Sequence, residues 1–291
     1  MNPSSPQTSP DVFPRTGSSL YYALAAVPAS RRQALQSWVQ WWHETAQIPF
    51  KIQDPGVAET KLRWWLQEVN DAAQNQGHHP LVLALSEAAK SAPDVQLPAW
   101  PLWTTQIEGL INLINQTRWL DDAGLQRHMR QTTGAAVEGA AVLLGATSEP
   151  AMQAAQQLGW GLRQAHQLAR LGQDARAGWI QVAIDVLQTH DVRAHQLSKP
   201  DPAGMPEGWP KLLTHLSEQA ATHLNGGLKA YRALPPSEQA ALIPLIVLTH
   251  IYLQLIDEIA RRGDRVLHER IMLTPLRKWW IAQRVRWGWL R

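Results

Sequence analysis

Apolar residues along this chain recur every three to four positions, the spacing that places them on one face of an α-helix. About ten stretches show the pattern, separated by short segments rich in Pro, Gly, Asp and Ser that end helices. They span residues 24–42, 62–69, 81–88, 102–113, 135–144, 158–171, 182–187, 212–228, 242–259 and 276–285. Because alternation typical of β-strands is almost absent, the sequence predicts an all-α protein, folded as a single domain of about ten helices.

The start of the chain differs in composition from the rest. Residues 1–17 are rich in Ser, Pro, Thr and Gln, with no basic segment followed by an apolar run. This composition predicts a disordered leader over residues 1–17, a folded domain over residues 18–291, and no secretory signal.

One apolar stretch is long enough to consider as a membrane span. No charged residue lies between Glu238 and Asp257, and a span needs about 20 apolar residues. Pro244, His250 and Gln254 interrupt the stretch, which favours a buried core helix. We therefore expect a soluble, cytoplasmic protein.

Composition excludes some kinds of site. The chain has no Cys, so it cannot form disulfides, thiolate nucleophiles, zinc–thiolate sites or iron–sulfur clusters. The formal net charge of +3 is too small to indicate nucleic-acid binding by itself.

Trp is unusually frequent, with 15 residues against 4 Tyr and 2 Phe. Such an excess suits an ordinary core, a large apolar cavity or a boundary between wet and dry surfaces.

Carboxylates are sparse at the spacing that metal sites on helices use. No Asp or Glu has another four positions on, and Glu68 with Asp71 is the one pair three apart. Asp121-Asp122 fits a helix cap. Asp257-Glu258 precedes Arg261-Arg262, which fits ion pairs along a helix. The carboxylates alone therefore predict no metal cluster.

His166 is polar where the stripe over residues 158–171 is otherwise apolar. A hydrogen-bonded core histidine is favoured over a ligand. Short motifs of zinc proteases, serine hydrolases and nucleotide-binding loops are absent from the sequence.

Six motifs, in order along the chain, together resemble the squalene/phytoene synthase family. They are Ser18–Ala25, Lys61–Trp65 with Glu68, His79–Leu81, Glu108–Gly109 with Gln116–Trp119, Leu158–Gly159 with Gly172–Gly178, and Leu276–Trp280. The resemblance runs from about residue 18 to residue 286, nearly the whole chain.

The resemblance implies a prenyl synthase-like helical bundle around a central apolar cavity. Active members condense two allylic prenyl diphosphates head to head, and two aspartate-rich motifs hold Mg²⁺ on the diphosphates. Ionising an allylic diphosphate leaves a pyrophosphate anion, whose charge metals and cations must stabilise.

The first aspartate-rich motif departs from the family pattern. Its two aspartates align with Ala46 and Gln47, and the usual Arg aligns with His43. None of these side chains is a carboxylate, so the first metal site implied by the resemblance is lost.

The second motif keeps one aspartate. Asp174 matches, whereas the other aspartate aligns with Arg170 and the usual Asn with His166. Arg170 could bind a phosphate directly or form a salt bridge with Asp174, four residues on. The salt bridge is favoured, and one Asp is poorly suited to hold a cluster of Mg²⁺ ions.

The resemblance also implies roles for other residues. Tyr21 and Tyr22 would line the substrate entrance, and Arg118 and Arg176 would face phosphate together with Arg170. Asp174 would be the residual metal ligand. An ordinary packing or surface role stays open for each.

The lost aspartates favour a non-catalytic protein that binds an isoprenoid diphosphate or isoprenoid lipid, or acts in assembly with a protein partner. The family has such a branch, the mitochondrial complex I assembly factors. The alternative is an active head-to-head prenyltransferase making a squalene, hopanoid or carotenoid precursor. Mg²⁺ is the expected cofactor if the protein is active, and none is expected otherwise.

The C-terminal stretch is basic and rich in Trp. No Asp or Glu follows Glu269, while cations and Trp alternate through Arg277, Lys278, Trp279, Trp280, Arg284, Arg286, Trp287, Trp289 and Arg291. This pattern is typical of a helix lying at a membrane surface, here the inner face. A terminal helix packed on its own domain is the open alternative. Nucleic acid is not an expected partner, because no recognition motif accompanies the charges.

Overall fold

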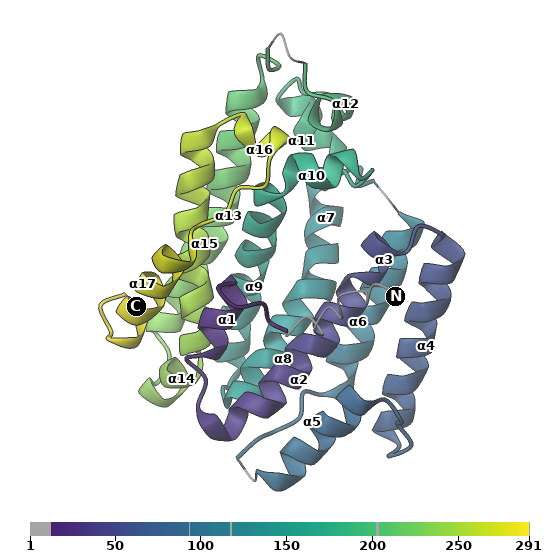
Figure 1. The fold of residues 1–291 in the computed structure, drawn as a ribbon, viewed down its shortest axis with the longest axis vertical. Helices are drawn as coiled ribbons and strands as arrows, with labels where there is room; N and C mark the ends of the chain where they lie inside the picture. The colour runs from purple at the N-terminus through teal and green to yellow at the C-terminus, as the bar shows by residue number, and fades with distance from the viewer. Residues whose placement is uncertain (1–12, 93, 117, 202–203, 291) are drawn as a thin grey trace, which may run out of the picture.

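The computed structural model describes residues 13–290 apart from 93, 117, 202 and 203, and every regular element in these ranges is helical (Figure 1). The first half contains α1 (Ser19–Leu24), α2 (Ala29–Ala46), α3 (Ile48–Lys51), α4 (Pro55–Ala73), α5 (Pro80–Ser91), α6 (Trp100–Asn115), α7 (Asp122–Met129), the π-helical turn η1 (Arg130–Gly134) and α8 (Ala135–Leu144). The second half contains α9 (Glu149–Ala169), α10 (Leu171–Arg176), α11 (Ile184–Thr189), α12 (Ala194–Ser198), α13 (Trp209–Arg232), α14 (Pro236–Ala241), α15 (Ile243–Arg262), α16 (Arg265–His268) and α17 (Pro275–Arg286).

The all-α prediction is confirmed, and each of the predicted stretches lies mainly on helix, although the stretch over 182–187 begins two residues before α11. The first stretch is two helices rather than one, because the chain leaves α1 at Ala25 and Pro28 becomes the N-cap of α2. Short helices such as α3 and α16, of four residues each, were not predicted. They are too short to repeat an apolar position.

Helix α9 runs through the middle of the bundle, in contact with α8 on one side and with α13 and α15 on the other (Figure 1). Its seam with α13 is built around glycine. A Cβ at Gly161 would lie 2.6 Å from Leu224 Cγ, and one at Gly227 would lie 2.6 Å from Leu158 Cγ. The two backbones therefore lie closer than larger residues at these positions would permit.

Tryptophan fills a second part of the core, between α2 and α6. Trp38, Trp41 and Trp103 are fully buried, with ring centroids 4.6–4.9 Å apart. The Trp38 indole N–H donates to Ala136 O at 2.8 Å, which ties α2 to α8. Part of the Trp excess is thus ordinary core.

Helix α15 is the apolar stretch considered above as a membrane span. It is the one helix in the described ranges that is long and apolar enough to cross a membrane. In this fold Ile246, Ile251 and Ile259 are buried, and the helix packs against α9, α13 and α17. The prediction of a core helix is confirmed.

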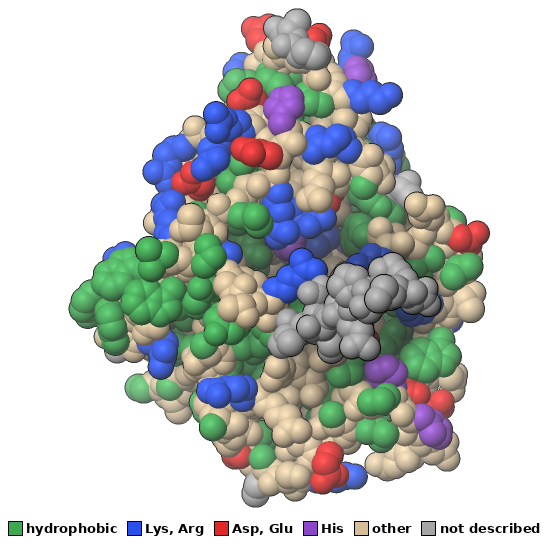
Figure 2. Space-filling model, viewed as in Figure 1, with side chains coloured by type: hydrophobic (Ala, Val, Ile, Leu, Met, Phe, Trp, Pro, Cys, Tyr) green, Lys and Arg blue, Asp and Glu red, His purple; other side chains and the backbone are tan. Residues whose placement is uncertain are grey.

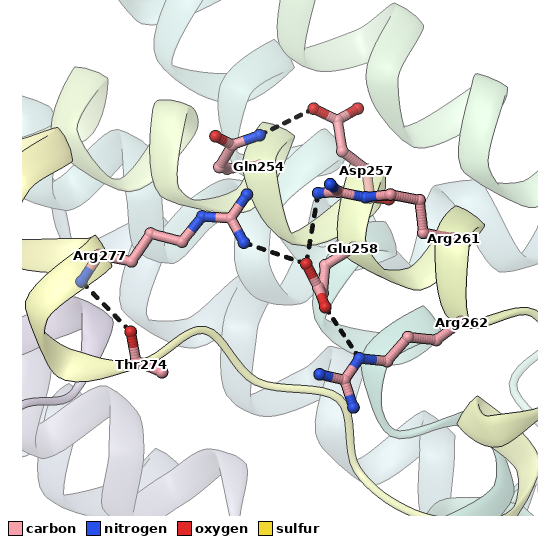
Figure 3. A network of polar contacts seen from close by, with 7 residues as sticks. All are labelled: Gln254, Asp257, Glu258, Arg261, Arg262, Thr274 and Arg277. Carbon is pink, nitrogen blue, oxygen red and sulfur yellow. Dashed lines mark hydrogen bonds and ion pairs between the residues drawn. The ribbon is translucent and has the colours of Figure 1, made fainter.

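Helix α17 is tied to α15 by the polar network in Figure 3. Glu258 on α15 accepts from Arg262 at 2.8 Å and from Arg277 on α17 at 3.0 Å. Asp257 accepts from Gln254 at 2.9 Å instead, so the predicted helical ion pairs form at Glu258. The network fixes where α17 starts on the domain.

The N-terminal segment packs on the same domain. Phe13 stacks on His43 with ring centroids 4.5 Å apart, and Gly17 O accepts from Lys278 Nζ at 3.0 Å. The predicted leader lies outside the described residues over 1–12.

The helix cap predicted at Asp121-Asp122 is confirmed. Asp121 Oδ1 accepts from Gly124 N at 2.6 Å, at the start of α7.

Candidate functional site

Four polar residues share one face at the end of α9 and through α10. Arg163 and His166 stand three positions apart on α9, Arg170 lies at the junction of α9 and α10, and Asp174 is on α10. Arg170 Nε and Nη2 donate to Asp174 Oδ1 at 3.1 and 3.0 Å. The predicted salt bridge is therefore confirmed.

The segment that follows α16 brings a third arginine to this face. Ile271 N donates to Ala169 O at 3.1 Å, which holds the neighbouring Arg270 beside the end of α9. A Cβ at Gly172 would lie 2.0 Å from Leu267 O. Glycine at this position is what lets α16 lie against α10.

Helix α17 adds Lys278, and the loop after α10 adds an amide. Lys278 donates to Gly17 O, and Arg163 Nη2 donates to Gln181 Oε1 at 2.8 Å. Both acceptors are neutral, so these hydrogen bonds orient the cations without cancelling their charge. We call Arg163, Arg170, Arg270 and Lys278 the basic cluster.

The charges of the basic cluster act on one another. Burial, then the charges of Arg163, Arg270 and Arg170, lower the pKa of His166 to about 3. Burial also lowers the pKa of Arg163 to about 10, and the pKa of Lys278 falls through burial and the charge of Arg270. At neutral pH His166 is uncharged, whereas Arg163 stays protonated.

Asp174 is the only carboxylate that pairs with the basic cluster in the described part of the chain. Lys and Arg side chains surround a hollow in the middle of the face drawn in Figure 2. Three arginines around one carboxylate, with Lys278 close to Arg270, favour an anion, and guanidinium groups match phosphate oxygens in a two-pronged geometry.

Mg²⁺ fits these donors poorly. Where the first motif should be acidic, Gln47 Nε2 only donates to His43 O at 3.1 Å, and Ala46 has no donor atom. Asp174 is engaged by Arg170. Across the described residues, no three His, Asp or Glu side chains come together as a metal site would need.

The two tyrosines named from the resemblance lie on α1. Their rings meet edge to face at 5.3 Å. Tyr21 is 40% exposed, whereas Tyr22 packs against the core. No hydrogen bond among the described residues joins either ring to the basic cluster, and their role at a substrate entrance stays a prediction.

Neither Arg118 nor Arg176 forms an ion pair with Asp174 in the described part of the chain, where Arg170 is its partner. Arg118 is exposed in the connection between α6 and α7. Arg176 donates to the carbonyl oxygens of Leu267 and His268, which attaches α10 to α16. The contact of Arg118 and Arg176 with phosphate stays a prediction. The hydrogen bonds of Arg176 to α16 give this residue a structural role as well.

A pocket of about 450 Å³ opens between α6 and α7, and no residue of the basic cluster lines it. Its lining is mainly neutral, and the one arginine in it, Arg127, is accompanied by the carboxylate of Asp121. We place the site at the basic cluster, because charge is what a diphosphate requires. The central apolar cavity stays a prediction.

The glutamate of the Lys-Leu-x-Trp-Trp stretch has a structural role. Glu68 is buried and accepts from the backbone N–H groups of His78 and His79, both at 2.6 Å. It therefore closes the turn between α4 and α5.

The sequence from residue 13 to residue 277 matches the family model described as squalene/phytoene synthase. The chain belongs to this family. Squalene/phytoene synthases bind isoprenoid diphosphates and are usually Mg²⁺-dependent prenyltransferases, and no metal-binding group is found among the described residues of this chain.

Solved structures agree on the fold. A dehydrosqualene synthase in complex with ligand aligns with a TM-score of 0.77 at 14% identity, covering 93% of this chain and 91% of that one. YisP from Bacillus subtilis aligns with a TM-score of 0.62 at 16% identity, covering 91% and 89%. The squalene synthase HpnC from Alicyclobacillus acidocaldarius gives 0.62 at 13%, covering 83% and 98%. Comparison with curated proteins finds no match.

Sequence reasoning missed Arg163, Arg270 and Lys278 as members of the site. Arg163 stands seven positions before Arg170 on the same helical face, so a search for aligned cations, rather than carboxylates, could have found it. Arg270 and Lys278 lie far along the chain and reach the site only through the packing of α16 and α17.

Proposed function

We propose that this chain binds an isoprenoid diphosphate by direct contact with the basic cluster, without paired aspartates holding Mg²⁺, and does not turn it over. The observation that carries the proposal is the basic cluster, in which the charges of Arg163, Arg170 and Arg270 act on Asp174 and Lys278 lies close to Arg270. By the family resemblance, Arg170 and Asp174 align with the second aspartate-rich motif, which holds Mg²⁺ in active members.

The replacement of a metal-binding carboxylate by an arginine supports binding of the diphosphate. In the family, metal ions between carboxylates and phosphates neutralise the ligand's charge. Here Arg170 stands in place of a carboxylate and its metal ion and supplies a fixed positive charge. Arg163 and Arg270 add two further positive charges. Direct cation–phosphate hydrogen bonds are charge-assisted and each contributes about 1.5–3 kcal/mol.

The same replacement of a carboxylate by Arg170 supports the loss of turnover. Mg²⁺ ions clamp both the diphosphate and its leaving oxygen while the allylic bond ionises. Asp174 alone, already paired with Arg170 at 3.0 Å, is a poor anchor for such a clamp. The ligand is therefore held as an intact diphosphate.

Calorimetric titration with farnesyl diphosphate, geranylgeranyl diphosphate and inorganic pyrophosphate tests binding, with Mg²⁺ and with EDTA in its place. We expect EDTA to leave the affinity unchanged. Arg163→Gln and Arg270→Gln should each weaken binding about 10- to 100-fold. Lys90→Gln, an exposed cation on α5, is the control and should have no effect.

Asp174→Asn separates the two kinds of site. If Asp174 holds Mg²⁺, this variant loses the ligand, and so does EDTA treatment. If the basic cluster holds the phosphates directly, removing one negative charge leaves binding equal or tighter. Loss of binding in Asp174→Asn would contradict the proposal.

Turnover is tested with labelled farnesyl and geranylgeranyl diphosphates and Mg²⁺. We expect neither pyrophosphate release nor C30 or C40 product from folded protein. Product above the level of a heat-inactivated sample would establish the alternative, an active prenyltransferase.

A further inference from the structure

The outer side of α17 and the residues after it expose five large apolar side chains. Leu276 is 73% exposed, Trp279 and Trp280 43% each, Trp287 53% and Trp289 64%. We call these residues the tryptophan face.

The tryptophan face is continuous. Ring centroids lie 5.8 Å apart for Trp280 and Trp287, 6.3 Å for Trp280 and Trp289, and 5.0 Å for Trp287 and Trp289. Hydrophobic side chains gather at the left edge of Figure 2, where Figure 1 shows α17. Extended apolar patches of this kind mark interaction sites on soluble proteins.

This face is not the side by which α17 packs on its own domain. The inner side buries Ile281 and Val285, and Lys278 donates to Gly17 O. Glu258 pairs with Arg277 at 3.0 Å (Figure 3). Helix α17 therefore packs on its own domain through its inner side, and that packing does not cover the tryptophan face.

The charges beside the tryptophan face are positive. Arg284 and Arg286 lie between Trp280 and Trp287 in sequence, and no Asp or Glu follows Glu269. Neither arginine pairs with a carboxylate in the described part of the chain. Arg277 is held at Glu258, whose single negative charge is shared with Arg261 and Arg262, and Arg291 lies outside the described residues.

We propose that the tryptophan face docks on an anionic lipid bilayer, with the indole rings at the level of the headgroups and Arg284 and Arg286 against lipid phosphates and carboxylates. Indole is apolar with one polar N–H, which suits that boundary. Basic residues beside it are attracted to anionic lipid. At 12 residues, α17 is too short to span a membrane, so it lies on the surface.

Charge also argues against a second copy of this chain as the occupant. In a two-fold dimer the same face would meet itself. Arg284 and Arg286 of both copies would then approach one another with no carboxylate on the face, and like charges opposed across an interface disfavour association.

Flotation of the purified full chain with lipid vesicles tests the proposal. We expect binding to vesicles of phosphatidylcholine with about a third phosphatidylserine, weaker binding to pure phosphatidylcholine, and release at high salt. Trp280→Ser with Trp287→Ser and Trp289→Ser should weaken binding at least tenfold. Trp64→Ser removes a Trp on α4 that is 50% exposed and is the matched control.

A second pair of variants tests the charges without touching the rings. Arg284→Glu with Arg286→Glu should weaken binding to anionic vesicles at least tenfold. Lys61→Glu with Lys90→Glu, an equal change of charge on exposed residues elsewhere, should not. The proposal is overturned if either pair of matched variants binds alike, if pure phosphatidylcholine binds as well, or if light scattering finds a dimer that the Trp variants abolish.

Discussion

Adding one methyl group to the seam between α9 and α13 should destabilise the protein. In Gly161→Ala the new Cβ would lie 2.6 Å from Leu224 Cγ, 2.7 Å from its Cδ2 and 2.8 Å from its backbone N. The side-chain contacts alone could relax by rotation. The contact with the backbone N requires α13 itself to move.

Two effects of opposite sign decide the magnitude. Ala is a better helix former than Gly and stabilises the helix by about 1 kcal/mol. Overpacking a closed seam costs about 1–3 kcal/mol, and the backbone contact at Gly161 places this case toward the upper end. We expect the free energy of unfolding to fall by about 1–2 kcal/mol, and the melting temperature to drop about 2 °C for each kcal/mol in a chain of this size.

Gly134→Ala is the matched control. A Cβ at Gly134 would have its nearest neighbour, Met129 O, at 3.7 Å, an ordinary contact. This variant should therefore be as stable as the unmodified protein or up to about 1 kcal/mol more stable. Urea unfolding followed by circular dichroism measures both. The reasoning fails if Gly161→Ala matches or exceeds the stability of Gly134→Ala.

Three further predictions concern the core, acid and the attachment of α17. Trp38→Phe should lower the free energy of unfolding by about 2–4 kcal/mol in urea titrations, because it removes the buried hydrogen bond from the indole to Ala136 O and opens a gap beside Gly139. Burial lowers the pKa of His128 to about 3 from 6.5; the unfolded chain therefore binds a proton that the folded one does not. As pH falls below about 6.5 toward 3, this His removes about 1.4 kcal/mol of stability per pH unit, and His128→Gln should show a correspondingly shallower loss between pH 6 and 4.5. Glu258→Gln should weaken the link to Arg277 (3.0 Å), so that the amides of α17 exchange hydrogen faster while those of α9 do not.

Local spacing predicted what depends on neighbours along one helix. The apolar period identified the helical stretches, the position of Asp121 predicted a cap, and the interval of four between Arg170 and Asp174 predicted their ion pair. Each needs one turn of helix and no knowledge of tertiary structure. The same rule could not separate α1 from α2, because apolar residues continue through the break before Pro28.

Tertiary packing determined the rest. Trp38 and Trp64 both stand in apolar-rich helices, yet one is fully buried and the other is 50% exposed. Which face of a helix meets the core depends on partners far along the chain. The same holds for Arg270 and Lys278, which no periodic pattern connects with Arg163. The changed metal residues implied by the family resemblance stay a prediction, and the surroundings of Arg170 and Asp174 required the fold.

The basic cluster makes part of this fold locally frustrated. Most contacts of a native protein support one another, whereas the positive charges of Arg163, Arg170 and Arg270 oppose one another, and Asp174 is the carboxylate that pairs with them among the described residues. Removing one of these arginines should make the empty protein more resistant to heat, although it would weaken any anion site. Such a gain would identify the cluster as one that selection keeps for a task other than stability.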